Sequence, residues 1–220
     1  MKHIVVITMI SIVATIANLS HLQSEILLRI CNVNKIGNEL IIEYKTINKG
    51  SSAIWMCQIL SVRSSLECEI EVDGKDKFVK IRRAGFRVPK GVDLDQPIVG
   101  KYVKIGKGET YHSRLRLDLP LKEINPFYPY GRFADHTKTC MADRLIFEVG
   151  IIREELKGNI YKDSSGNSFA LVNCTRIEKH PELIISETIK NVRLPCLKLK
   201  TENRETILKE LLMDRKHRRH

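Results

Sequence analysis

The fold class of this chain is decided by Tyr111-His112-Ser113-Arg114-Leu115-Arg116-Leu117-Asp118-Leu119. Side chains along this stretch alternate in character, and the apolar residues share one face with Ser113. The other face carries only polar and charged side chains, which are His112, Arg114, Arg116 and Asp118. A period of two residues is typical of a half-buried antiparallel strand and is incompatible with the apolar stripe of a helix. The stretch therefore predicts a strand with one face in a core.

Other segments are rich in the β-branched and aromatic residues that favour strands, and they lie at 39–47, 53–60, 68–72, 78–82, 145–153 and 168–174. Turn-forming residues separate several of them, at 73–74, 106–108 and 163–167. Many short strands without intervening amphipathic helices indicate a sandwich or a barrel rather than a parallel α/β sheet. We therefore predict an all-β fold, and specifically an antiparallel β-sandwich.

Two stretches resemble the immunoglobulin-like β-sandwich domains of exported proteins. From Tyr44 to Trp55, a strand runs into a polar turn and continues as an apolar strand that contains the tryptophan. The stretch from Val103 to Tyr111 is similar to the glycine-containing turn before a long strand in such domains. Trp55 lies only two positions before Cys57, so the core disulfide of antibody-type domains is not assigned. The resemblance implies an immunoglobulin-like fold but no function.

The N-terminus has the pattern of an export signal. Lys2 and His3 precede a run of apolar and small residues that extends from residue 4 to about Ala17. Small side chains at Thr15 and Ala17 favour cleavage after Ala17, so we assign 1–17 to the signal peptide, with about residue 23 as the other boundary. The run is at the short end of what a bilayer span needs, so an uncleaved anchor is the alternative. We expect an exported protein, periplasmic or secreted, that is membrane-anchored if the leader is retained.

Residues 24–200 are predicted to form a single β-sandwich domain, because no linker or internal repeat divides them. A C-terminal α-helix and a basic tail are predicted over 201–220, where one helical face carries Ile207, Leu208, Leu211 and Leu212. The formal net charge of the chain is +11, and the tail holds part of that excess. The tail is a candidate contact for an anionic surface, through Arg215, Lys216, Arg218 and Arg219. No specific nucleic-acid partner is expected, because an exported protein has limited access to chromosomal nucleic acid.

Six cysteines are candidates for disulfide bonds, and they are Cys31, Cys57, Cys68, Cys140, Cys174 and Cys196. An even number in an exported chain suits a fully paired set, but the sequence does not choose among the possible connectivities. Two disulfide bonds are possible between cysteines that flank neighbouring strand segments, and they are Cys57 with Cys68 and Cys140 with Cys174. Ordinary buried thiols are the alternative. The sequence contains no Cys-x-x-Cys spacing, which argues against a zinc ribbon or a thioredoxin-like centre.

Motifs that carry known catalytic chemistry are missing from the sequence. It contains no Gly-x-Ser-x-Gly elbow, phosphate loop, dinucleotide glycine pattern or His-Glu-x-x-His segment, so we assign no catalytic residue and no cofactor. The densest polar group is Asp135, His136, Cys140 and Asp143, and we interpret it as a solvated loop rather than a metal site. His112 and His180 are single histidines that we interpret as surface or hydrogen-bonded residues. Whether the protein is an enzyme is uncertain, and the sequence favours a non-enzyme.

An aromatic loop is the second candidate for binding. Two prolines hold an extended segment that contains Phe127, Tyr128, Tyr130 and Arg132. It either packs over one end of the sandwich or forms an exposed contact surface with residue types that are common at interface hot spots. The function hypothesis is therefore an exported, non-enzymatic β-sandwich that binds a protein or a cell-envelope component. The alternative is a small secreted hydrolase or protease inhibitor whose active residues are dispersed.

Overall fold

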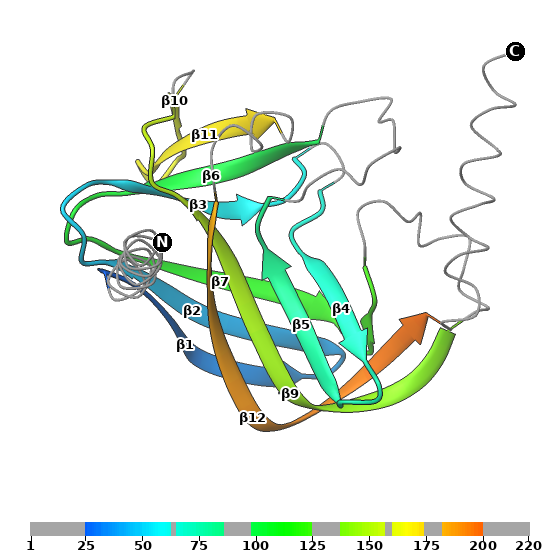
Figure 1. Cartoon of the computed structure of the whole chain (residues 1–220). Helices are drawn as coiled ribbons and strands as arrows, with labels where there is room; N and C mark the ends of the chain where they lie inside the picture. The colour runs from blue at the N-terminus through cyan, green and yellow to red at the C-terminus, as the bar shows by residue number, and fades with distance from the viewer. Residues whose placement is uncertain are drawn as a thin grey trace, which may run out of the picture.

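The computed structural model describes residues 25–62, 65–85, 98–124, 137–156, 160–173 and 182–199. Every regular element within these ranges is a β-strand, so the all-β expectation is confirmed for this part of the chain (Figure 1). The signal peptide, the aromatic loop with Phe127, Tyr128, Tyr130 and Arg132, and the C-terminal helix and tail lie outside the described residues. No helix in the described part is long and apolar enough to cross a membrane.

A small sheet of three strands is entirely antiparallel. Its order is β1-β2-β7, and the strands are β1 (Ile26–Ile36), β2 (Glu39–Asn48) and β7 (Thr110–Asp118). Residues alternate strictly between buried and more exposed along β2. In β7, the predicted inward residues Leu115 and Leu117 are less exposed than their neighbours Arg114 and Arg116, which confirms the alternation expected from the sequence.

A large sheet of nine strands forms the second layer. Its main path is β10-β11-β6-β3-β9-β12-β8, and β5 joins β9 at one side and carries β4. The strands are β3 (Ile54–Ile59), β4 (Glu69–Asp73), β5 (Phe78–Arg83), β6 (Val99–Ile105), β8 (Leu121–Lys122), β9 (Thr137–Ile152), β10 (Ile160–Lys162), β11 (Ser168–Asn173) and β12 (Leu183–Leu199). Two pairs, β5 with β9 and β12 with β8, are parallel. The expectation of a purely antiparallel fold is therefore wrong in this detail, because β5 reaches β9 through a crossover rather than a hairpin.

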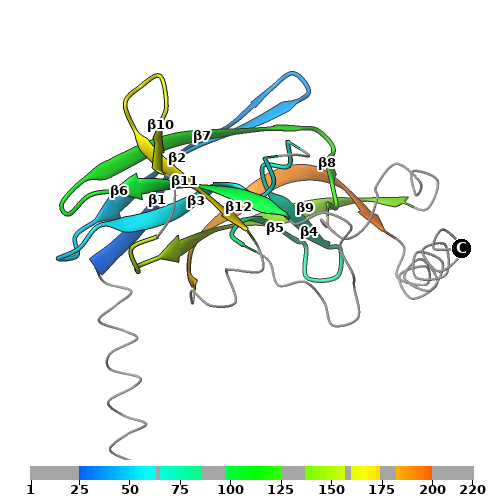
Figure 2. The same ribbon diagram turned by 90° about the horizontal axis from the view of Figure 1, so that it is seen from above.

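The two sheets share one core and lie as two layers in Figure 2. Leu40, Ile42 and Leu115 of the small sheet belong to the same buried cluster as many residues of β4, β5 and β9. At its centre, the rings of Tyr44 and Phe147 lie 4.6 Å apart. A second buried cluster contains Trp55 and Tyr102. Because Met56 belongs to the first cluster and its neighbours Trp55 and Cys57 to the second, the large sheet is buried on both faces in this region.

A buried cation lies between the two layers. Arg83, at the end of β5, is 2% exposed, and its Nη1 donates to the Tyr44 hydroxyl over 2.8 Å. Its Nη2 donates to the Glu67 carboxylate. Burial alone would lower the pKa of Arg83, but Tyr44, Cys68 and Glu67 outweigh it and raise the pKa, so the side chain keeps its charge.

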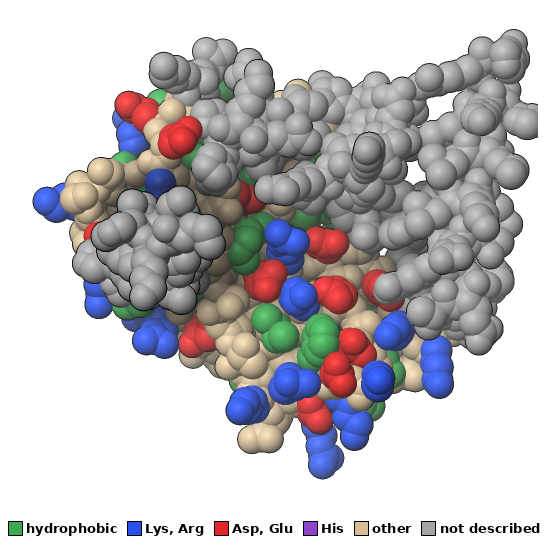
Figure 3. Space-filling model, viewed as in Figure 1, with side chains coloured by type: hydrophobic (Ala, Val, Ile, Leu, Met, Phe, Trp, Pro, Cys, Tyr) green, Lys and Arg blue, Asp and Glu red, His purple; other side chains and the backbone are tan. Residues whose placement is uncertain are grey.

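The outward face of the large sheet carries a mixture of both charge signs (Figure 3). Lys80 on β5 bonds to Glu71 on β4 over 3.0 Å, and Arg82 lies 3.8 Å from Glu148 on β9. These pairs follow the strand register, in which Glu71 is opposite Lys80 and Arg82 is opposite Glu148. Opposite charges therefore neutralise one another across the strands of this face.

A long ribbon of β9 and β12 connects the layers, and β12 also contacts β1 of the small sheet. Glu187 on β12 accepts the backbone N–H of Ile30, and Lys35 Nζ donates to the carbonyl of Arg193 over 2.7 Å. The register of β9 and β12 shifts between Lys190 and Leu194, where Asn191 has a φ of 61°. Neither β1 nor β12 is expected from the sequence.

Candidate binding face of the small sheet

A row of three basic side chains crosses the small sheet. Arg29 on β1 is directly opposite Lys45 on β2, and Lys45 is directly opposite His112 on β7. All three point outward, because the residues that alternate with them, such as Leu28, Tyr44 and Thr46, belong to the buried side. We call Arg29, Lys45 and His112 the basic row.

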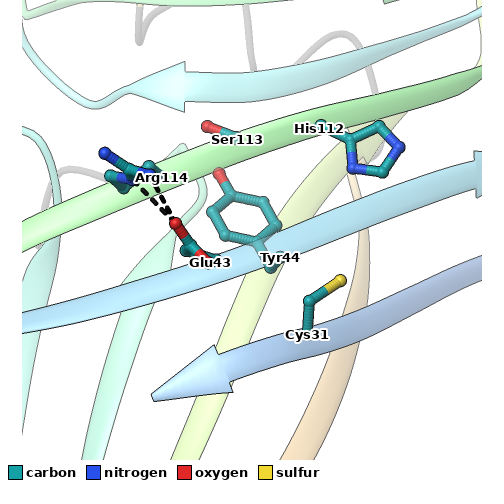
Figure 4. Close-up of a pocket in the computed structure, with 6 residues that line it drawn as sticks. All are labelled: Cys31, Glu43, Tyr44, His112, Ser113 and Arg114. Atoms are coloured by element: carbon teal, nitrogen blue, oxygen red, sulfur yellow. Dashed lines mark hydrogen bonds and ion pairs between the residues drawn. The ribbon is translucent and has the colours of Figure 1, made fainter. Parts of the chain in front are cut away.

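Beside the basic row is a hollow of about 380 Å³, lined by Cys31, Glu43, Tyr44, His112, Ser113 and Arg114. Figure 4 shows Glu43 and Arg114 meeting across β2 and β7, with Cys31 and His112 on the other side of Tyr44. Cys31 reaches this position because β1 has a register shift between Ile30 and Asn32. Such a bulge redirects a side chain that regular pairing would place elsewhere.

Charges within the hollow are partly compensated. Arg114 Nε donates to Glu43 Oε1 over 3.0 Å, and its Nη2 reaches the same oxygen. Arg29 Nη1 lies 3.8 Å from Glu187 Oε1, a long contact with the neighbouring β12. Among the described residues, no acidic side chain forms an ion pair with Lys45 or His112. The centre of the basic row is therefore uncompensated within the described structure.

The other end of the same face is acidic. Glu39 on β2 and Asp118 on β7 are directly opposite each other, and both are exposed. Lys45 and Glu39 are six residues apart on β2, which corresponds to about 20 Å along a strand. One end of the face therefore carries the basic row and the other end carries Glu39 and Asp118, with Arg116 next to this acidic pair.

The same hollow brings together a thiol, an imidazole and a carboxylate, the three groups of a cysteine hydrolase. Cys31 is exposed, and its Sγ faces the carbonyl of Arg29 at 3.8 Å. Glu43 is held by Arg114. Within the described structure, no hydrogen bond joins Cys31 to His112 or His112 to Glu43. The side chains share a hollow without the contacts that activate a nucleophile.

A second polar group is buried near the start of β12. The Glu182 carboxylate accepts hydrogen bonds from the backbone N–H of Gly85 and from the Tyr102 hydroxyl, each at 3.1 Å. Burial raises the pKa of Glu182 to about 7, although both hydrogen bonds oppose the shift. Burial also raises the pKa of Tyr102 and of the neighbouring Cys57. The group ties β12 to β6 and to the end of β5, and we interpret it as structural.

The residues assigned to binding from the sequence lie outside the described structure. The loop residues Phe127, Tyr128, Tyr130 and Arg132 and the tail residues Arg215, Lys216, Arg218 and Arg219 lie outside it, so both assignments stay predictions. Asp135, His136 and His180 also lie outside it, and Cys140 and Asp143 are part of β9. The described residues contain no group of three or more side chains suited to hold a metal ion.

The five cysteines in the described part carry free thiols, and Cys174 lies outside it. Cys57 and Cys68 do not form the expected hairpin, because β3 and β4 are not paired. Cys57 belongs to the second buried cluster and Cys68 to the first.

Sequence reasoning missed the basic row. Arg29, Lys45 and His112 come from three strands that are far apart along the chain, and no motif connects them. Alternation shows that His112 points away from the core, but only the register shows what stands beside it. Comparisons with protein-family models, with curated proteins and with solved structures found no match to this chain.

Proposed function

We propose that this chain is an exported, non-enzymatic β-sandwich protein that binds an acidic protein or an anionic envelope component through the basic row. The packing of two sheets around one core supports a sandwich, and the immunoglobulin-like form of that sandwich is part of the proposal. Export rests on the N-terminal leader. The predicted aromatic loop and basic tail would add contacts to the same partner.

The observation that carries the proposal is the placement of Arg29 directly opposite Lys45, with His112 next to them in the same row. Cations placed directly opposite each other on neighbouring strands repel, and this repulsion destabilises the folded state. The large sheet pairs opposite charges on β4, β5 and β9, although Lys138 and Lys198 are also directly opposite each other on β9 and β12. An anionic group laid across β1, β2 and β7 would remove the repulsion, so the free energy lost in folding would be recovered on binding.

The acidic end of the face adds a constraint on the partner. Glu39 and Asp118 would repel an anionic group that ran along the whole strand direction. The bound anion should therefore lie over the basic row and across the strands. Two copies of the chain could also place the basic end of one over the acidic end of the other, so the mass in solution must be measured alongside binding.

Binding of a fluorescent poly-glutamate peptide and of phosphatidylglycerol vesicles tests the proposal at low and high salt. The double variant R29Q/K45Q should bind its preferred probe roughly five- to tenfold more weakly at low salt, and the difference should shrink at high salt. The peptide represents an acidic protein and the vesicles represent an anionic envelope. The probe that responds to R29Q/K45Q identifies the class of partner.

The matched control is K138Q/K198Q, which removes the same charge from another pair of opposed lysines, on β9 and β12. It should bind like the wild type. Equal losses in the two double variants would show attraction to net charge alone and would contradict a specific role for the basic row. Binding of the same probes by a chain without residues 215–220 measures the contribution of the predicted tail.

A secreted hydrolase is the second candidate, because Cys31, His112 and Glu43 line one hollow. In that case, side-chain rotation in the free protein would bring Cys31 and His112 into hydrogen-bond contact, and H112N would slow alkylation of Cys31 by iodoacetamide at neutral pH. Equal alkylation rates in the wild type and H112N would remove the observation that favours an enzyme.

A further inference from the structure

Two cysteines stand directly opposite each other in the β9–β12 ribbon. Cys140 on β9 is the register partner of Cys196 on β12. The rows on both sides are paired as well, Lys138 with Lys198 and Ala142 with Leu194, so the register at the cysteines is fixed from both directions. Directly opposed residues project from the same face of a sheet, which places both thiols on one side.

The separation of opposed strand residues suits a disulfide bond. Paired Cα atoms in an antiparallel ladder are about 4.5 or 5.5 Å apart, depending on the type of pair, and both values lie within the range of disulfides. Opposed Cβ atoms are typically about 4.5 to 5.5 Å apart, whereas a disulfide joins Cβ atoms about 3.5 to 4.5 Å apart. Bond formation therefore requires a small approach of the two strands and suitable side-chain rotamers.

The two thiols differ in their exposure to solvent. Cys196 is 0% exposed and belongs to the main core, whereas Cys140 is partly exposed at the edge of that core. Gly74, in the turn between β4 and β5, lies over Cys140, since a Cβ built on Gly74 would be 3.8 Å from the Cys140 Sγ. Among the described cysteines, no other two are register partners, and Cys31 is exposed at the opposite layer.

We propose that Cys140 and Cys196 form a cross-strand disulfide when the protein folds in an oxidising environment. The oxidant is a low-molecular-weight disulfide such as oxidised glutathione. One thiolate attacks it and releases one reduced glutathione, and the second thiolate then attacks the mixed disulfide and releases another. The protein loses two protons and two electrons in total, and one oxidised glutathione becomes two reduced molecules.

Folding is the stage at which the bond forms most readily. Burial raises the pKa of Cys140, and it raises the pKa of Cys196 to about 12, so both thiols are mainly protonated in the folded protein at neutral pH. Only the thiolate is nucleophilic, so the folded dithiol reacts slowly. An unfolded chain has ordinary thiols, which the pairing of β9 with β12 brings together. Once formed, the bond is buried on the side of Cys196, and a reductant reaches it through the partly exposed Cys140.

Peptide mapping of the full-length protein tests the proposal. The reduced, unfolded chain is refolded in glutathione buffer, remaining thiols are alkylated, and the product is digested with trypsin without reduction. Cleavage at Lys138, Arg144, Arg193 and Lys198 releases one peptide at 139–144 and one at 194–198, each with one cysteine. The expected product is these two peptides joined, at the sum of their masses less two hydrogen atoms, and separated by reductant.

The exposed Cys31 shows in the same sample that the oxidant acted, because it should carry glutathione. Free, alkylated Cys140 and Cys196 beside a modified Cys31 would overturn the proposal. A bond from either residue to another cysteine, such as Cys174, would overturn it as well. Each result is read from the wild-type chain, so no variant has to fold.

A second measurement tests whether the disulfide between β9 and β12 stabilises the folded protein. Reductant should lower the Tm of the oxidised wild type by roughly 5 to 10 °C, because the closed loop restricts the unfolded chain. The same treatment should leave the Tm of C140S/C196S unchanged, while C31S should behave like the wild type. Equal responses in all three proteins would contradict the proposed pairing.

Discussion

At the scale of single residues, Glu182 makes the stability of this protein depend on pH. Its pKa is raised from 4.5 to about 7 by burial, so the folded state holds a proton that the unfolded state releases above about pH 4.5. The stabilisation is complete below pH 4.5 and is lost as the pH rises through 7. The free energy of unfolding should therefore fall by up to about 3 kcal/mol across this range from Glu182 alone.

The variant E182Q should lose this contribution and become more stable than the wild type at pH 8. The glutamine amide oxygen can still accept from Gly85 and Tyr102, while Arg82 is the cation that faces this group. Urea unfolding of both proteins at pH 5 and pH 8 gives the difference directly. Parallel pH dependences would contradict the buried, protonated carboxyl.

Arg83 and Tyr44 provide a test of the buried polar contact between the layers. Y44F removes the acceptor of Arg83 Nη1 and should cost about 1 to 3 kcal/mol, because the guanidinium stays buried with a further donor unsatisfied besides Nε. R83M leaves the Tyr44 hydroxyl unsatisfied. The double variant should cost less than the sum of the single ones by roughly 1 to 2 kcal/mol in denaturant unfolding. Additive costs would show that the two side chains are not coupled.

At the scale of elements, the close approach of β9 to the end of β5 depends on Gly150. A Cβ at this position would lie 2.8 Å from the Cβ of Ala84 and would also overlap the Glu182 carboxylate. G150A should therefore destabilise the protein by about 1 to 3 kcal/mol, as expected for overpacking. G74A is the matched control, because its Cβ would meet neighbours only at 3.7 Å or more, and it should change stability by less than about 0.5 kcal/mol. Equal costs would contradict the packing at Gly150.

Strands with a clear period of two could be predicted from the sequence. The expected segments at 39–47 and 111–119 correspond to β2 and β7, and those at 68–72, 78–82 and 168–174 match β4, β5 and β11 to within one residue at either end. In each of them, one face is packed and the other is not, so alternation in the sequence reflects alternation in burial.

The long strands β1 and β12 could not be predicted in this way. After Ile30, β1 is exposed on both faces apart from the partly buried Val33, so its residues do not alternate clearly. Strand β12 contains Pro195, and proline within a run of residues argues against a strand. Its pairing with β9 is also interrupted by a register shift next to Asn191. The predicted segment at 145–153 likewise covers only the regular part of β9, which begins at Thr137.

At the scale of the whole molecule, the candidate site is a product of register rather than of any local sequence. Arg29, Lys45 and His112 become neighbours only because β1 pairs with β2 and β2 pairs with β7 at particular offsets. A shift of one residue would move each side chain to the other face of its strand. The same holds for Cys140 and Cys196, whose opposition follows from the pairing of β9 with β12.

The two layers also differ in how charged side chains are arranged on their outward faces. The large sheet neutralises Glu71 with Lys80 and Arg82 with Glu148 on its outward face. The small sheet pairs Glu43 with Arg114 in its middle, but it has the basic row at one end and Glu39 beside Asp118 at the other. Complementary potentials guide association and fix orientation, so the polarised layer is the one we expect a partner to cover.

The most direct test of this account is NMR mapping of the isotope-labelled protein with a poly-glutamate peptide or phosphatidylglycerol nanodiscs. Binding through the basic row predicts that the amide signals of Arg29, Lys45 and His112 shift together, while those of β4 and β5 stay in place. The shifts should disappear in R29Q/K45Q and persist in K138Q/K198Q. Shifts confined to the large sheet or to residues 201–220, with the small sheet unaffected, would contradict the proposed binding face.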